Sequence, residues 1–116
     1  MIRVGVDARL LSRPLTGIGR YTFEMCRALA QQSDRITLFL YSPAPIPDSI
    51  QQALKPSHFR CTYWRNAVLR QLWAETLLPY TAQQDNLHVF WGPAHRLPFL
   101  LSKKIASVVT IHDLVW

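Results

Sequence analysis

Two glycines one residue apart stand at the start of a helical pattern, behind a short apolar segment that ends in an aspartate. The segment is "VGVD", residues 4–7, and the glycines are Gly17 and Gly19. Glycines at a helix start expose backbone N–H groups at the positive end of the helix, which suits a phosphate. A sugar could also approach the backbone closely there. The other interpretation is structural, with Gly17 in a turn and Gly19 packed against a sheet, and the residues alone favour neither.

A histidine and an aspartate are adjacent near the end of the chain, in "TIHDL", residues 110–114. His112 could donate or accept a proton near neutral pH, because histidine has an ordinary pKa of about 6.5. It could equally be a structural histidine that hydrogen-bonds a nearby carbonyl. His58 and His88 have no such context. A metal site built from His88, His95 and His112 is disfavoured, because no carboxylate stands beside them at ligand spacing.

The glycine pattern differs from the known nucleotide-binding loops. A dinucleotide fingerprint has its glycines directly at the first strand-to-helix turn. Here Gly17 comes ten residues after Asp7, and Thr22 stands in the place of the third glycine. The second apolar strand ends in "LYS", with no acid to hold a ribose. A P-loop is excluded because no glycine precedes a Lys-Ser or Lys-Thr pair.

An alternation of strand and helix patterns must position these residues. Apolar alternation and apolar runs predict strands at 2–7, 35–42, 59–64, 87–91 and 105–113. Helical spacing predicts helices at 17–32, 48–54 and 66–83, with Asp48 capping the second. This order predicts an α/β fold, a Rossmann-like parallel sheet with helices on both faces.

The strand order also indicates where a ligand would bind. In open parallel sheets, ligands lie beyond the carboxyl ends of the strands. The loops after Asp7, Trp91 and Ile111 are therefore the expected site. Residues 8–16 are expected to be a loop, strand 59–64 to lie at an edge, and strand 105–113 to be buried and central.

The helix predicted at 66–83 is amphipathic. Its apolar stripe consists of Leu69, Leu72, Trp73, Leu77 and Tyr80. Such a stripe packs against a sheet, or, with arginines beside it, lies on an anionic membrane surface. The sequence leaves both possibilities open, and Pro79 is expected to kink or end the helix.

Composition limits the classes of function. A chain of 116 residues forms one domain at most, and its 49% hydrophobic residues can form a core. The 13 Lys and Arg residues against 7 Asp and Glu give a net charge of +6, which favours acidic partners. Nucleic acid would suit that charge, but no nucleic-acid motif accompanies it. Cys26 and Cys61 match no zinc or redox spacing, so both are expected to be buried, reduced thiols.

Two long segments, joined by the strand–helix alternation between them, resemble the N-terminal half of family 4 (retaining) glycosyltransferases of the GT-B fold. The first, "VGVDARLLSRPLTGIGRYTFEMCRAL", is similar to the family's D-x-R…GIGRY loop. The second, "LHVFWGPAHRLPFLLSKKIASVVTIHDLVW", is similar to its H-x-P…K…V-x-T-I-H-D-L run. The resemblance covers essentially the whole chain.

The resemblance implies roles for particular residues. At the donor diphosphate and the transferred sugar it places Gly17, Ile18, Gly19 and Arg20. His112 would be the catalytic residue, in contact with the donor sugar near the reacting carbon, and Asp113 would help to fix its loop. On the acceptor side it places Trp91, His95 and Arg96.

The activity implied is transfer of a sugar, with retention, from a nucleotide-sugar to a glycan or lipid-linked acceptor. Positive charge and helix N-termini would stabilise the departing diphosphate, so no metal and no other cofactor are expected. The D-x-D motif that holds a metal in the other large glycosyltransferase architecture does not occur here. The alternative is a non-catalytic binding module for a phosphorylated small ligand.

The resemblance also predicts the domain organisation. In the family, a C-terminal domain binds the nucleotide with two glutamates eight residues apart, whereas Glu24 and Glu75 are the only glutamates here. Residues 1–116 are therefore expected to be a partial, acceptor-side N-terminal domain, inactive alone and self-associating through uncovered apolar surface. The expected location is cytoplasmic, with peripheral contact to the inner face of the membrane as an option, and no nucleic-acid partner is expected.

Overall fold

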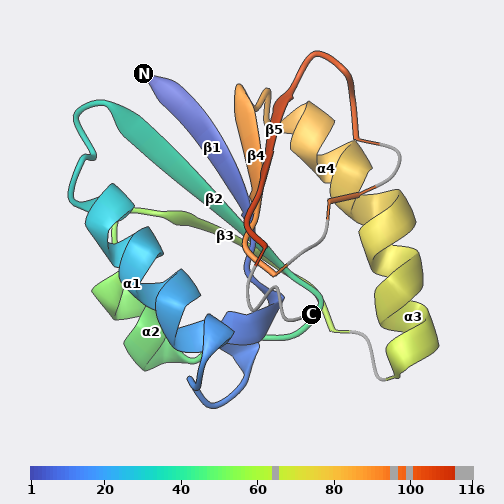
Figure 1. Cartoon of the computed structure of the whole chain (residues 1–116), viewed down its shortest axis with the longest axis horizontal. Coiled ribbons are helices and arrows are strands. Elements are labelled where there is room, and N and C mark those ends of the chain that lie inside the picture. The colour runs from blue at the N-terminus through green and yellow to red at the C-terminus, as the bar shows by residue number, and fades with distance from the viewer. Residues whose placement is uncertain (64–65, 95–96, 99–100, 112–116) are drawn as a thin grey trace.

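A computed structural model describes residues 1–63, 66–94, 97–98 and 101–111. Five strands form one all-parallel sheet in the order β3-β2-β1-β4-β5 (Figure 1). The strands are β1 (Ile2–Asp7), β2 (Ile36–Ser42), β3 (His58–Cys61), β4 (Val89–Gly92) and β5 (Ala106–Val109). Helices α1 (Ile18–Ala30) and α2 (Asp48–Ala53) cover one face, and α3 (Ala67–Leu72) and α4 (Leu78–Gln84) cover the other. The predicted α/β, Rossmann-like fold class is confirmed.

The core has two layers because side chains alternate between the faces of each strand. Leu38 and Leu40 of β2 pack into the cluster beneath α1 and α2. Phe39 and Tyr41 of the same strand pack into the cluster beneath α3 and α4. β1 brings Gly5 under this second layer, where a Cβ would collide with the side chain of Leu87. Any larger residue at position 5 would therefore force the buried Leu87 side chain to move.

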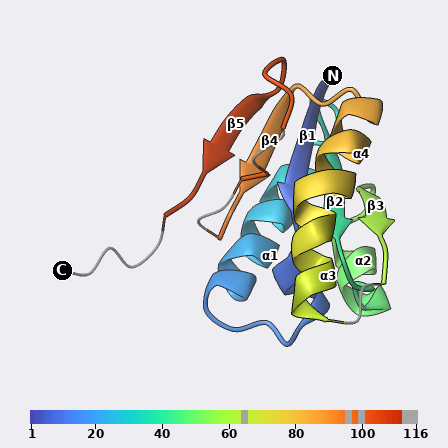
Figure 2. The same ribbon diagram turned by 90° about the vertical axis from the view of Figure 1, so that its right-hand side faces the viewer.

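β5 corrects one expectation. The strand predicted at 105–113 as buried and central is β5, which occupies an edge of the sheet, and residues 106–109 are all exposed. Figure 2 shows no helix over β5. The apolar run suggested burial, but β5 has only β4 as a neighbouring strand among the described residues, and no described helix covers it (Figure 2). The prediction that the third strand lies at an edge is confirmed by β3.

The helix predicted at 66–83 is interrupted rather than continuous. Between α3 and α4 the chain forms a π-helical turn, Trp73–Leu77. Pro79 cannot donate a hydrogen bond to the carbonyl of Glu75, four residues before it, but it lies in the first turn of α4 and does not end the helix there. The wider turn shifts the buried face to Trp73, Ala74, Leu78, Pro79 and Ala82. Leu72 and Tyr80 of the predicted stripe are exposed.

Three smaller expectations were wrong. The N-cap of α2 is Pro47, and the side chain of Asp48 makes no capping hydrogen bond. Residues 9–12, expected to be part of a loop, form a 3-10 turn (Arg9–Ser12). Cys61 is exposed, whereas Cys26 is buried, and burial raises the pKa of the Cys26 thiol to about 12.

In the part of the chain that the structure describes, no helix is long and apolar enough to cross a membrane.

Candidate functional site

The direction in which successive strands are added to the sheet reverses at the boundary between β1 and β4. The connection from β1 through α1 leads to β2 on one side, whereas the connection from β3 through α3 and α4 leads to β4 on the other. Ligands of parallel sheets bind at such a switch point, beyond the carboxyl ends of the strands. Asp7 is the last residue of β1, so its side chain lies where the fold predicts a ligand.

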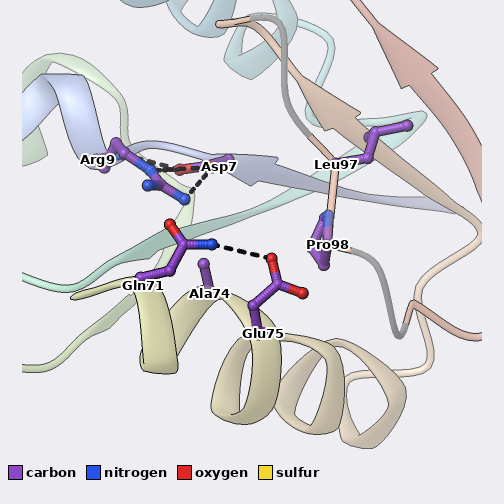
Figure 3. A pocket seen from close by; sticks show the side chains of 7 residues that line it. All are labelled: Asp7, Arg9, Gln71, Ala74, Glu75, Leu97 and Pro98. Carbon is purple, nitrogen blue, oxygen red and sulfur yellow. Dashed lines mark hydrogen bonds and ion pairs between the residues drawn. The ribbon is translucent and has the colours of Figure 1, made fainter. Parts of the chain in front are cut away.

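A cavity of about 450 Å³ lies at this switch point. Its lining comes from three separate segments (Figure 3): Asp7 and Arg9 after β1, Gln71, Ala74 and Glu75 on the helical segment, and Leu97 and Pro98 after β4. We call this cavity the β1–β4 crevice. Its volume falls within the range of small-molecule sites.

Arg9 and Asp7 form a rigid ion pair at one wall of the crevice. The Arg9 Nη2 donates to Asp7 Oδ2 at 2.8 Å, and Nε lies 3.0 and 3.1 Å from the two carboxylate oxygens. The side chains are only 17% and 8% exposed. The guanidinium also lies 5.4 Å above the ring of Trp73. Its Nη1 has no acceptor among the described residues, so it can donate to a ligand.

Gln71 and Glu75 form the opposite, helical wall. The Gln71 Nε2 donates to Glu75 Oε1 at 3.2 Å. Glu75 belongs to the π-helical turn, a feature that frequently occurs at functional sites. Glu75 Oε2 and Gln71 Oε1 have no partner among the described residues and can each accept a hydrogen bond.

The loop of residues 17–20 lies at the start of α1. Gly17 has φ +50°, in the region that favours glycine, and no side chain caps the helix. The amides of Ile18 and Arg20 have no acceptor within the described residues. Gly17, Ile18 and Gly19 line a second cavity of about 370 Å³, together with Leu10, Arg13, Pro14 and Thr16. This loop can therefore present amide donors and the Arg13 guanidinium to an anion.

The two glycines differ in their surroundings. The Gly19 amide donates to the Thr16 carbonyl at 2.9 Å, so it is already used within the loop. A Cβ on Gly19 would lie 3.5 Å from the Leu10 carbonyl oxygen, an ordinary contact. The positive φ of Gly17 agrees with the interpretation that this glycine forms a turn. Gly19 does not pack against the sheet, because the atoms nearest to it belong to Leu10 and Leu15, in the segment before α1.

Trp91 lies on the other face of the sheet from the crevice. It is buried in the layer beneath α1, and its indole N–H donates to Thr110 Oγ1 at 2.8 Å. Its ring meets Tyr21 edge-on, with 6.2 Å between the centroids. The structure thus does not bring Trp91 together with Asp7 and Arg9. His95, Arg96, His112 and Asp113 lie outside the described residues.

Neither described histidine belongs to the crevice. His88 is exposed, and its Nδ1 accepts the backbone N–H of Arg3 at 2.9 Å. His58 stacks on Phe39 with 4.9 Å between the ring centroids. Within the described residues, no three side chains of the types His, Cys, Asp and Glu gather as metal ligands.

Four side chains of the crevice were missed as site residues from the sequence. Asp7 and Arg9 belong to the D-x-R motif, so the motif itself was a signal for them. Gln71 and Glu75 are four residues apart, which places them on one face of a helix. That this face looks into a cavity opposite Arg9 follows from the tertiary structure alone.

The crevice is suited to reversible binding of a polar molecule. Donors and acceptors converge on it from two walls, and Pro98 supplies apolar contact from a third side (Figure 3). No protein family, curated protein or solved structure matches this chain. The function of the site is therefore inferred from its residues and geometry.

Proposed function

We propose that the chain is the acceptor-side domain of a retaining, metal-independent glycosyltransferase that uses a nucleotide-sugar donor. The observation that carries the proposal is the loop at residues 17–20. It follows β1 at the carboxyl edge of a parallel sheet, begins α1 with Gly17 at φ +50°, and leaves backbone amides open beside a cavity. The motif resemblance places the donor diphosphate at the same loop.

The chemistry follows from the charges at this loop. Negative charge develops on the diphosphate as the sugar leaves, and preorganised donors stabilise it most at that point. The amides of Ile18 and Arg20, the positive end of α1, and the side chains of Arg13 and Arg20 would supply that stabilisation. No metal or cofactor is needed for this role.

The remaining roles come from the resemblance. His112 would contact the donor sugar at the reacting carbon, and Asp113 would hold its loop in place. The acceptor would enter over the segment after β4, of which Leu97 and Pro98 line the crevice. His95 and Arg96 belong to the same segment of the chain and stay predicted acceptor residues.

The test uses the intact native protein that contains this chain. Transfer of radiolabelled sugar would be measured with a panel of nucleotide-sugars, and the anomeric configuration of the product would be determined by NMR. Replacing His112 with Ala should lower kcat by about 100-fold, the usual cost of losing one transition-state contact. Arg20→Ala should lower kcat as well.

Arg35→Ala is the matched control for Arg20→Ala. Arg35 is exposed and lies just before β2, at the amino end of the sheet and away from the loop. Its replacement should leave kcat unchanged. Wild-type turnover in His112→Ala, or a product of inverted configuration, would contradict the proposal. Nucleotide binding by the intact protein with every donor left unconsumed would instead favour a binding module for a phosphorylated ligand.

A further inference from the structure

We infer that the β1–β4 crevice binds a neutral, polyhydroxylated ligand such as a sugar ring, and that Glu75 excludes phosphorylated ligands from it. The inference rests on the proposed function only where that ligand is identified as the acceptor. It concerns Arg9, to which the resemblance gives no role, and Gln71 and Glu75, which lie outside its motifs.

The charges of the lining point to a neutral ligand. Asp7 and Arg9 neutralise one another through their ion pair. Glu75 has only the uncharged amide of Gln71 as a partner among the described residues. Among the lining residues that the structure describes, one negative charge is therefore in excess, although the whole chain has a net charge of +6. A phosphate group in this cavity would be repelled by Glu75.

The unused hydrogen-bonding atoms of the crevice favour a ligand that carries hydroxyl groups. The open positions are a donor, Arg9 Nη1, and two acceptors, Gln71 Oε1 and Glu75 Oε2. A hydroxyl both donates and accepts, so neighbouring hydroxyls of one ring can bond Arg9 and the two acceptors together. A phosphate dianion only accepts, and it would leave Gln71 Oε1 and Glu75 Oε2 facing its oxygens.

The crevice is also preorganised for such a ligand. The Asp7 carboxylate and the Trp73 ring hold the Arg9 guanidinium in one orientation. Little side-chain freedom is therefore lost when a ligand binds to it. Pro98 offers an apolar surface for the C–H groups of a ring (Figure 3). Free, oriented donors and acceptors beside an apolar surface fit a polyol better than an ion.

The test is an NMR titration of the ¹⁵N-labelled chain. The neutral probes are maltose, methyl α-D-mannopyranoside and methyl β-D-galactopyranoside, and the charged probe is glucose 6-phosphate. At least one neutral saccharide should shift the amides of Arg9, Gln71 and Glu75 in a saturable way. Glucose 6-phosphate should bind there about tenfold more weakly, because one repelling charge acts at partly solvated distance.

The variant Glu75→Gln removes the charge and keeps the shape. It should strengthen binding of glucose 6-phosphate at the crevice by about tenfold and change binding of the neutral saccharide far less. Glu24→Gln is the matched control, because Glu24 is the other glutamate of the chain and pairs with Arg27 on α1, outside the crevice. It should change neither affinity.

Three outcomes would overturn the inference. The first is saturable binding of glucose 6-phosphate as tight as that of the neutral saccharides. The second is an equal effect of Glu24→Gln and Glu75→Gln on the affinity for glucose 6-phosphate. The third is the absence of amide shifts at the crevice with any neutral saccharide. The proposed function fails separately. If the crevice prefers neutral saccharides but the intact protein transfers no sugar, only the glycosyltransferase proposal is wrong.

Discussion

At the scale of single residues, the structure requires glycine at one of the two glycine positions in the 17–20 loop and not at the other. Gly17 adopts φ +50°, a conformation that side-chain-bearing residues rarely adopt, and a Cβ there would meet nothing within 4 Å. Gly19 has helical geometry within α1 and ordinary space for a Cβ. Backbone conformation therefore requires glycine at position 17, whereas neither conformation nor space requires it at position 19.

Alanine substitutions should separate the two positions. Gly17→Ala should lower the free energy of unfolding by about 1 kcal/mol through backbone strain. Gly19→Ala should leave it unchanged or raise it by up to about 1 kcal/mol, because alanine is the better helix former. Urea unfolding followed by circular dichroism measures both. Equal destabilisation by the two substitutions would contradict this account.

At the scale of elements, one carboxylate joins α4 to the edge of the sheet. Asp85, just after α4, accepts a hydrogen bond of 2.6 Å from the Tyr41 hydroxyl on β2. It also accepts bonds of 3.2 and 3.0 Å from Nε and Nη2 of Arg60 on β3. Burial and the bond to Asp85 raise the pKa of Tyr41 above its ordinary range. The end of α4 is thus held against two strands by a partly buried network.

Removing the charge of Asp85 should weaken this attachment. Asp85→Asn replaces an acceptor of charge-assisted bonds by a neutral amide, and the free energy of unfolding should fall by about 2 kcal/mol. Asp34→Asn is the control, because Asp34 is exposed and lies 4.0 Å from Arg35. Its effect should stay within about 0.5 kcal/mol. Thermal unfolding of both variants tests this, and equal effects would mean that the network contributes nothing.

At the scale of the whole molecule, the two edges of the sheet differ. The β3 edge carries His58 and Arg60 and follows Pro56, features that discourage pairing with another strand. β5 has the sequence ASVV, with no charge and no proline. The amides of Ala106 and Thr110 donate to β4, so those of Ser107 and Val109 point outward. As far as the described residues show, the β5 edge is therefore open to another strand.

A charge on this edge should reduce self-association of the chain. Val109→Lys should lower the association constant by about tenfold, since a lysine on an edge strand disfavours pairing by more than 1 kcal/mol. Val68→Lys on α3 is the matched control, because Val68 is exposed but far from any strand edge. Sedimentation equilibrium measures both. A wild-type chain that stays monomeric at high concentration would contradict the expectation.

Local sequence patterns determined the fold class and much of the element order. Three elements lie close to their predicted bounds: β1, α1 and β2. The patterns that predicted them, apolar alternation, helical spacing and an apolar run, each depend on residues only a few positions apart. The loop at residues 17–20 could also be singled out, because the glycine pair is a local motif. Its proposed role in catalysis still depends on the resemblance.

Only the tertiary structure decided which residues meet in the β1–β4 crevice. Glu75 and Arg9 are more than sixty residues apart in the sequence. They line one cavity because the sheet order places β1 beside β4 and the helical segment that carries Glu75 packs over that junction. The exposure of β5 arose in the same way, from its place in the sheet. Short-range periodicity carries no information on strand order or on the phase of an interrupted helix. Long-range packing sets both, so the sequence determined the elements and the fold determined the site.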